Sequence, residues 1–447
     1  MDDISNEFTI IDEGTDEGAD DSEDAHSASS FNVSSLRQPT RKKRETDIRK
    51  TTRTCLEELH GALLHHQWTK AAEFMQNYIQ VLEDPSSQQK MHSSQRVWRM
   101  GAEILRHHPD ATVEDLNSFY DRMKHLHMSN YLKVSLEHAF YLISKDKIED
   151  AKRQLSLAES WRYGKFSASQ EKIAKLIQAY HGLLDFSIWI TKRNQLVENG
   201  SHDFADTASN QEMHTYFRQA SSKFHEVIKQ PGVWDPFVLC FVKLLEFYDD
   251  YNGAVQVLNN YAYNDGFPAN PNAHIYLYKF LKKNNADMKK LVKVLRVLHI
   301  LVPSHKLMFK LCSLLDGLDK TKYQQESLKI LFDLLDYSDW KNNLKVWKRL
   351  KKKISLLIKL GHSEWINEQW ESRRDWWPAF HFSTYQAKRN VSDNLNLACK
   401  KATVAGFLLS KRCRYFKVVY KEGMKANPKL MKKMKKRIEK SSIASQS

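Results

Sequence analysis

The sequence predicts an all-α protein: an irregular array of helical hairpins, similar to a tetratricopeptide solenoid, with a disordered acidic N-terminal tail and a disordered basic C-terminal tail. Three observations indicate this class. Apolar residues recur at i, i+3, i+4 and i+7 along most of the chain, and no stretch sustains the alternation of a strand. Only 10 prolines and 14 glycines occur in 447 residues, so helices have few interruptions.

The first 50 residues are the predicted N-terminal tail, acidic and then basic. Residues 1–36 contain no Lys or Arg, while acidic residues recur among Ser, Gly and Thr from Asp2 to Asp24. Such a segment buries too little apolar surface to offset the entropy of ordering, so disorder is expected. The run RKKR at 41–44 follows and is typical of a nuclear-import signal.

An N-terminal helical-hairpin block is predicted over residues 51–190. Thr54 and Glu57 have the spacing of a capping box, which indicates that the first helix begins at Thr54. A second helix follows from Trp68 and ends before Pro85. The same helical spacing of apolar residues returns in successive segments as far as Leu184.

Small residues indicate that these helices pair as hairpins. Ala139, Ala151, Leu155 and Ala158 have the small, small, large, small spacing of a tetratricopeptide hairpin, in which small side chains let two helices approach closely. Partial copies occur, though not at a 34-residue period, so the array is irregular or the match is a coincidence among amphipathic helices. The partial copies are Ala71, Met75 and Tyr78, and Ala254, Leu258 and Tyr261.

A polar loop over residues 191–212 is expected to separate this block from a C-terminal helical block over residues 213–427. Near the end of that second block, Ala398, Ala402 and Ala405 repeat at i, i+4 and i+7. A row of small residues forms a groove suited to close helix packing. The end of the block is therefore predicted to be a tight helical unit.

A cationic helix face is predicted between residues 341 and 359. At 100° per residue, basic residues gather on one side, and Trp347, Leu350, Ile354 and Leu357 on the other. The basic side is either a solvated outer face or a surface that contacts phosphates or an acidic partner. Its candidate residues are Lys341, Lys345, Lys348, Arg349 and Lys352, with Lys359 on the same side.

The basic tail is predicted over residues 428–447. Its run KLMKKMKKRIEK carries Leu430, Met434 and Ile438 at i, i+4 and i+8, so it is expected to become an amphipathic helix on binding. Removing residues 429–447 is expected to weaken DNA association and nuclear accumulation while leaving the fold intact. The candidates for phosphate contact and nuclear import are Lys432, Lys433, Lys435, Lys436 and Arg437.

An aromatic cluster, RRDWWPAFHF, occupies residues 373–382. A base-stacking platform would need aromatic residues spread on a sheet or groove, and no strand pattern exists here. Two interpretations remain: a core plug that joins two helical layers, or a buried interface with another protein, since Trp and Arg are typical interface anchors. The candidate residues are Trp376, Trp377, Phe380, Arg373 and Arg374.

Neither catalysis nor a bound cofactor or metal is expected. The chain has no Walker loop, no GxGxxG after a strand, no HExxH and no GxSxG elbow. The adjacent His pairs at 65–66 and 107–108 are poor chelators, because neighbouring helical side chains point about 100° apart. Five dispersed cysteines without a CxxC favour reduced thiols. No apolar run of membrane-spanning length and no signal peptide is evident, so a soluble, non-secreted protein is expected.

The net charge of +15, from 69 Lys and Arg against 54 Asp and Glu, suits a polyanionic partner without identifying it. A more specific indication comes from segments in chain order over residues 52–420. They closely resemble the family of TATA-box-binding protein-associated factors that forms the A subunit of the RNA polymerase I group. The segments are HQWTKAAEFMQNYIQVLED, NYLKVSLEHAFYL, PGVWDPFV, NPNAHIYLYKFLKK, VPSHKLM, RRDWWPAFHFS and VAGFLLSKRCRYF.

The resemblance implies a subunit of a promoter selectivity factor that joins the TATA-box-binding protein with several associated factors on ribosomal RNA gene promoters. Such a factor recruits RNA polymerase I in the nucleolus, and its subunits of this family look like helical-repeat scaffolds without catalytic residues. The expected function is thus a non-enzymatic scaffold in pre-initiation complex assembly, with direct contact to promoter DNA left open. The alternative is a free-standing nuclear DNA- or RNA-binding protein that acts through its Lys-rich tail.

Overall fold

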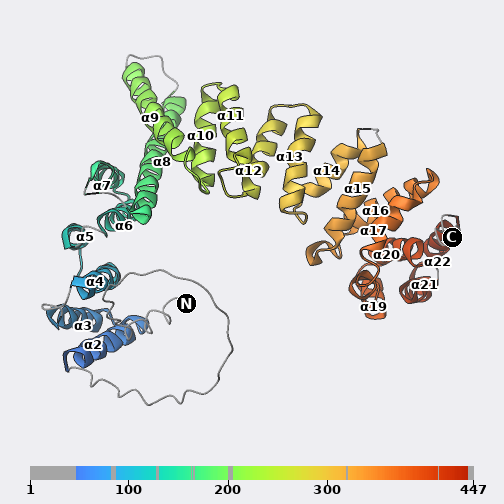
Figure 1. The fold of residues 1–447 in the computed structure, drawn as a ribbon, viewed down its shortest axis with the longest axis horizontal. Coiled ribbons are helices and arrows are strands. Elements are labelled where there is room, and N and C mark those ends of the chain that lie inside the picture. The colour runs from blue at the N-terminus through green and yellow to red at the C-terminus, as the bar shows by residue number, and fades with distance from the viewer. Residues whose placement is uncertain are drawn as a thin grey trace, which may run out of the picture. The chain divides into compact units, whose positions relative to one another are not determined.

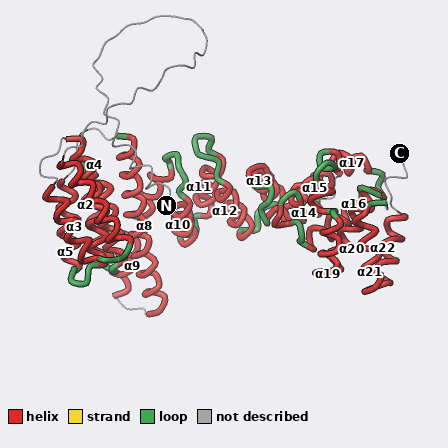
Figure 2. The backbone as a smooth tube through the Cα atoms, turned by 90° about the horizontal axis from the view of Figure 1, so that it is seen from below, coloured by secondary structure: helices red, strands yellow, loops and turns green. Residues whose placement is uncertain are grey.

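The computed structural model describes residues 47–81, 87–126, 130–162, 164, 167–199, 205–318, 321–410 and 412–440. All regular secondary structure in these residues is helical, and Figure 2 shows helices joined by short loops. The predicted all-α class and hairpin array are confirmed. The run at 41–44 and the acidic segment lie outside the described residues. The chain divides into two compact units, residues 1–84 and 85–447.

The first unit contains one helical hairpin, α2 (Asp47–Leu64) and α3 (Trp68–Val81). Leu59, Ala71 and Tyr78 are buried in it. The first helix begins at Asp47 rather than at Thr54, because the Thr54 hydroxyl donates to the carbonyl oxygen of Lys50 at 3.0 Å inside the helix and does not cap its start.

The second unit is a series of helices in chain order, coloured from cyan to red in Figure 1. From α4 to α15, each helix packs against the next one or the next but one in the chain. These helices are α4 (Ser87–His107), α5 (Val113–Leu126), α6 (Tyr131–Ser144), α7 (Ile148–Ser160), α8 (Ala168–Asn199), α9 (Ala205–Ile228), α10 (Asp235–Phe247), α11 (Tyr251–Tyr263), α12 (Pro271–Lys283), α13 (Met288–Leu301), α14 (Leu307–Asp316) and α15 (Thr321–Leu335).

The hairpin interpretation of the small residues holds. Ala139, Ala151, Leu155 and Ala158 are all buried in one cluster where α6 packs against α7. Ala254, Leu258 and Tyr261 are likewise buried on α11. Small side chains at these positions let the two helices of a hairpin approach closely.

The hairpins share a turn that the sequence reasoning did not detect. At the end of the first helix, one residue adopts a positive φ, and the next N–H reaches back five residues to a helix carbonyl oxygen, as in a Schellman motif. In α10 the positive φ is 57° at Asp249, and the N–H of Asp250 donates to Leu245 at 2.9 Å. The same arrangement occurs at His66, Asp146, Asn285 and Gly361.

The polar loop predicted over residues 191–212 is wrong in extent. Residues 191–199 complete α8 and residues 205–212 begin α9, and the two helices pack as a long hairpin. Polar residues there lie on exposed helix faces, where Lys192 and Glu212 form an ion pair at 2.9 Å. One hydrophobic core cluster extends across this segment, from Ala179 to Ile438, so no boundary between compact units lies there.

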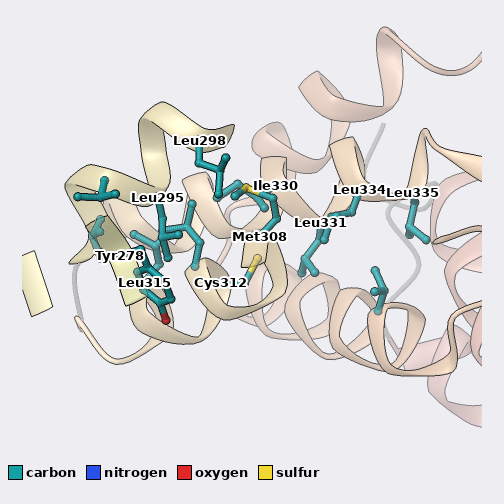
Figure 3. Close-up of a cluster of buried hydrophobic side chains, with 14 of the residues drawn as sticks. Tyr278, Leu295, Leu298, Met308, Cys312, Leu315, Ile330, Leu331, Leu334 and Leu335 are labelled. Atoms are coloured by element: carbon teal, nitrogen blue, oxygen red, sulfur yellow. The ribbon is translucent and has the colours of Figure 1, made fainter. Parts of the chain in front are cut away.

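That core is built of aliphatic side chains between successive hairpins. Figure 3 shows Leu295 and Leu298 of α13, Met308 and Leu315 of α14, and Leu331 of α15 directed into one shared interior. All five are fully buried. Each fully buried Leu or Met stabilises the fold by about 1.5 to 3 kcal/mol relative to an exposed side chain.

The helices after α15 pack in a different way. Here α16 contacts α20, α19 contacts α21, and α20 contacts α22, so the helices interlock instead of following one another. They are η3 (Ser338–Trp340), α16 (Leu344–Lys359), α17 (Ser363–Glu371), α18 (Trp377–His381), α19 (Thr384–Asp393), α20 (Leu395–Leu408), α21 (Arg414–Ala426) and α22 (Pro428–Lys440). Ala398, Ala402 and Ala405 are buried on α20, as the predicted close packing requires.

Helix α22 corrects the prediction of a disordered basic tail for residues 428–440, while residues 441–447 lie outside the described part. Its Met431, Met434 and Ile438 are buried. Two glycines make room for them. A Cβ at Gly406 of α20 would lie 2.5 Å from Ile438 Cδ1, and one at Gly423 of α21 would lie 2.6 Å from Met431 Sδ. The helix is thus part of the fold, because its apolar edge fits against two facing helices.

The described ranges contain no candidate for a membrane span, because none of their helices is both long enough and apolar enough. Within the same ranges, no group of three or more His, Cys, Asp or Glu side chains is placed to hold a metal ion.

Candidate functional site

The aromatic cluster forms an aromatic node, defined as Phe332, Trp347, Trp377, His381 and Phe382, which joins α15, α16 and α18. The ring of Trp377 is fully buried and stacks on Phe332 at a centroid distance of 5.1 Å. Trp347 lies 6.1 Å from Trp377, and His381 lies 4.8 Å from it in an edge-to-face arrangement. Pro378 in the first turn sets the start of the short helix that carries Trp377 and His381.

Arg373 closes the node from one side. It is buried, and its guanidinium donates to Asp336 through Nε and Nη2 and to Asp333 Oδ1 at 2.6 Å. The indole Nε1 of Trp377 donates to the same Asp336 carboxylate at 2.7 Å. A buried cation with two carboxylate partners satisfies its hydrogen-bonding capacity within the chain.

These contacts divide the predicted interface residues. Trp377 and Arg373 belong to the core, so they are not available to a partner. Trp376 is 39% exposed, Arg374 is exposed beside Glu371, and Phe380 is half-buried with Lys341 Nζ 4.2 Å from its ring centroid. Trp376 and Phe380 lie 5.7 Å apart and form the outer edge of the cluster.

Behind the node lies a buried lysine that sequence reasoning missed. Lys401 of α20 is fully buried, donates to Asn342 Oδ1 at 3.1 Å, and places its Nζ 5.3 Å from the ring centroid of Trp347. Burial, together with the nearby charge of Lys341, lowers the pKa of Lys401 to about 7. Burial likewise lowers the pKa of His381 to about 3, with Lys401 adding to the effect.

The predicted cationic face of residues 341–359 is present in part. Lys345, Lys348, Lys352 and Lys359 are exposed on α16, opposite the buried Trp347 and its apolar neighbours. Lys341 precedes the helix and covers Phe380.

Arg349, in contrast, is engaged inside the fold, where its Nη2 lies 2.6 Å from Asp316 Oδ2. Lys353, which the sequence did not single out, is buried and pairs with the same carboxylate. Burial of Asp316 acts to raise its pKa, but Lys353 and Arg349 outweigh burial, and the pKa of Asp316 lies below its usual value. Arg349 is therefore a structural residue.

A cluster at the junction of α16, α20 and α22 joins two basic regions that the sequence treated separately. Lys351 of α16 is half-buried, and its pKa is lowered to about 8 by burial and then by Lys400 of α20, Arg437 of α22, Lys352 and Lys348. The shift arises because these cations lie close together without compensating charge. Lys351 and Lys400 could not be found from the sequence, since only the packing brings them together.

The predicted tail residues line the outside of α22. Lys432, Lys433, Lys435, Lys436 and Arg437 are all exposed, on the side away from the buried Met431, Met434 and Ile438. Lys435 lies at one flank with its Nζ 5.8 Å from the ring centroid of Tyr420 on α21, and Arg437 lies at the other flank near Lys351. The basic residues of α16, α20 and α22 therefore form one basic surface.

Comparisons with known proteins agree with the resemblance noted in the sequence. The family model described as TAF RNA Polymerase I, A subunit, matches residues 61–421. A mouse relative, the A subunit of the TATA box-binding protein-associated factors of RNA polymerase I, is 45% identical over 401 residues, covering 90% of this chain and 88% of that protein. The human protein of the same name is 44% identical, with coverage of 90% and 89%.

Solved structures add little to this. The tetratricopeptide domain of P58(IPK) aligns over 88% of this chain and 99% of its own length, at 12% identity and a TM-score of 0.23. The hairpin architecture consequently rests on the packing of this chain's own helices.

Proposed function

The chain belongs to the family of TAF RNA Polymerase I A subunits, and on that premise we propose that it is a non-enzymatic scaffold subunit of a TATA-box-binding-protein-containing promoter selectivity factor for RNA polymerase I. It would act in assembly of the pre-initiation complex at ribosomal RNA genes, in the nucleus and nucleolus. Its partners would be the TATA-box-binding protein, other RNA polymerase I associated factors and the polymerase machinery.

The observation that carries the proposal is the family match over residues 61–421, which spans nearly all of the described hairpins. A series of hairpins exposes an extended surface on which several partners can sit at once. No step in such a role requires a reactive centre, so the protein would work by holding other molecules in place.

For one partner contact we propose the exposed edge of the aromatic cluster, Trp376 and Phe380, with Arg374 beside it. Aromatic and Arg side chains are the commonest anchors of protein interfaces, and an exposed tryptophan gains much from being covered. The buried Trp377 and Arg373 would hold this edge rigid from behind.

The test is affinity purification of the tagged full-length chain from cell nuclei, with crosslinking mass spectrometry of the purified complex. The TATA-box-binding protein and the other associated factors should co-purify, and crosslinks should fall near residues 374–380. A Trp376→Ala and Phe380→Ala variant that melts like the parent should lose at least one partner. Purification of the chain without the TATA-box-binding protein would contradict the proposal.

A second candidate is a free-standing nuclear DNA- or RNA-binding protein acting through the Lys-rich C-terminal segment. The five exposed basic residues on one side of α22 favour it. Purified alone, such a protein should bind promoter fragments tightly and retain its preference in the presence of competitor DNA. Weak, sequence-independent binding by the isolated chain would favour the scaffold role instead.

A further inference from the structure

We propose that the basic surface of α16, α20 and α22 binds the phosphate backbone of double-stranded DNA as a single preformed site, rather than through a flexible tail. Its members are Lys345, Lys348, Lys351 and Lys352 on α16, Lys400 on α20, and Lys432, Lys433, Lys436 and Arg437 on α22. The inference rests on the proposed function, because a promoter factor is where a contact of this kind would serve.

The first argument is that the charges are uncompensated. Among the described residues, none of these nine side chains forms an ion pair with a carboxylate, whereas Arg349 and Lys353, on the other flank of α16, share Asp316. Cations that lie close together repel one another, and half-burying Lys351 adds a desolvation cost. A polyanion would relieve both costs by supplying the missing negative charge.

The second argument is that the surface is rigid. Helix α22 is held by side chains that enter the space left by two glycines, Ile438 against Gly406 and Met431 against Gly423. Arg437 therefore lies at a fixed position beside Lys351, which a flexible tail could not maintain. A phosphate bound between them would find its partners already placed, at a lower entropic cost than on a disordered segment.

The third argument concerns the kind of polyanion. Single-stranded nucleic acids bind to exposed aromatic rings on which bases stack. On these helices Trp347 is buried, and Tyr420 is half-buried with Lys435 at its ring, so no stacking platform is offered. At 1.5 Å per residue, α16 and α22 are about 24 and about 20 Å long. A duplex carries about one charge per 1.7 Å of axis, so helices of this length can meet several phosphates.

The test measures binding of the full-length chain to a 30-base-pair duplex of mixed sequence by fluorescence anisotropy, between about 50 and about 200 mM salt. Lys351→Gln, Lys400→Gln and Arg437→Gln are combined in one variant. The affinity should fall to a similar degree for unrelated duplex sequences, and the slope of log K against log salt should become shallower by about 3, about 1 for each cation removed from the phosphates.

A matched control removes the same charge elsewhere. Lys282, Lys289 and Lys290 are exposed on α12 and α13, and their combined change to Gln should leave the salt slope within about 1 of the parent value. An equal loss in this control would mean that only overall charge matters, and would overturn the site.

A second variant tests rigidity with every charge kept. Met431→Asn with Ile438→Asn removes the apolar anchors of α22, and duplex affinity should drop toward that of the charge variant. Unchanged affinity would overturn the preformed site, as would tighter binding of single-stranded DNA or of duplex RNA. Co-purification with the TATA-box-binding protein reports separately on the proposed function, so each idea can fail without the other.

Discussion

Arg373 and Asp336 form a two-point ion pair, in which Nε donates to Oδ1 at 2.9 Å and Nη2 donates to Oδ2 at 2.8 Å. The partners are 37 residues apart in the chain, so the pair joins the segment before α18 to the end of α15. Trp377 donates to the same carboxylate, which makes Asp336 the acceptor on which the aromatic node is built.

Arg373→Gln is expected to lower the free energy of unfolding by about 2 to 3 kcal/mol, because Asp333 and Asp336 lose a shared cation while largely buried. Arg373→Lys should recover only part of the loss, since an ammonium cannot reproduce the bidentate geometry. Urea unfolding measures both. Arg374→Gln is the control, because Arg374 is exposed, and a loss equal to that of Arg373→Gln would contradict the assignment.

Trp377→Ala should destabilise the protein by about 3 to 5 kcal/mol, because a fully buried ring is replaced by a cavity in the aromatic node. Trp376→Ala, one residue away and 39% exposed, should cost about 1 kcal/mol or less. Thermal unfolding of both variants makes the comparison. If Trp377→Ala melts like the parent, the node is not the core that its burial indicates.

Lys401 should make stability depend on pH. Its pKa is about 7 in the folded chain and has an ordinary value of 10.5, so between these pH values the unfolded chain holds a proton that the folded chain lacks. Stability contributed at this residue therefore rises with pH over that window, and the full cost of the buried charge is present below about pH 7.

Lys401→Met removes this cost. The variant should be more stable than the parent at pH 6, and the difference in melting temperature should shrink as the pH rises to 9. Lys401→Arg, which stays charged throughout, should instead fall further behind the parent over the same range. A constant difference between Lys401→Met and the parent from pH 6 to 9 would show that Lys401 does not titrate there.

Asn285→Gly should stabilise the hairpin of α12 and α13 by up to about 1 kcal/mol, because Asn285 has a φ of 51° that glycine adopts without a Cβ clash. Asn284→Gly, at a φ of −92°, should destabilise by a similar amount. Chemical denaturation of the two variants tests the recurring turn. A gain in stability from both would point to a cause other than backbone conformation.

Deleting residues 428–447 should destabilise the helices that α22 covers, contrary to the expectation of an intact fold. Each of Met431, Met434 and Ile438 buries a side chain that stabilises by about 1.5 to 3 kcal/mol. Hydrogen exchange should accelerate in α20 and α21 and remain as in the parent in α10 to α13. Unchanged exchange throughout would restore the interpretation of these residues as a tail.

The sequence predicted the helices and their pairing because apolar periodicity and small residues are local signals. Ala139 and Ala151 mark a hairpin without reference to anything far away. It did not predict that residues 191–199 and 205–212 are helical, because a helix whose exposed face is polar has the composition of a loop. The ends of α8 and α9 are held by packing against each other, which composition does not record.

The candidate site was predicted less well, for a similar reason. Trp377 was correctly considered for the core, but the burial of Arg373 depends on Asp333 and Asp336, which lie 40 and 37 residues earlier in the chain. The docking of α22 depends on glycines in two other helices. Lys351 and Lys400 become neighbours of Arg437 only when those helices are in place.

The two styles of packing in the second unit have a mechanical consequence. Between α4 and α15, helices touch only their near neighbours in the chain, so small rotations at successive contacts add up and the array can bend at low energetic cost. From α16 to α22 the contacts skip along the chain and brace one another, so bending there would break several of them at once. A partner that strains the array would deform the earlier hairpins and leave the last seven α-helices with their geometry unchanged.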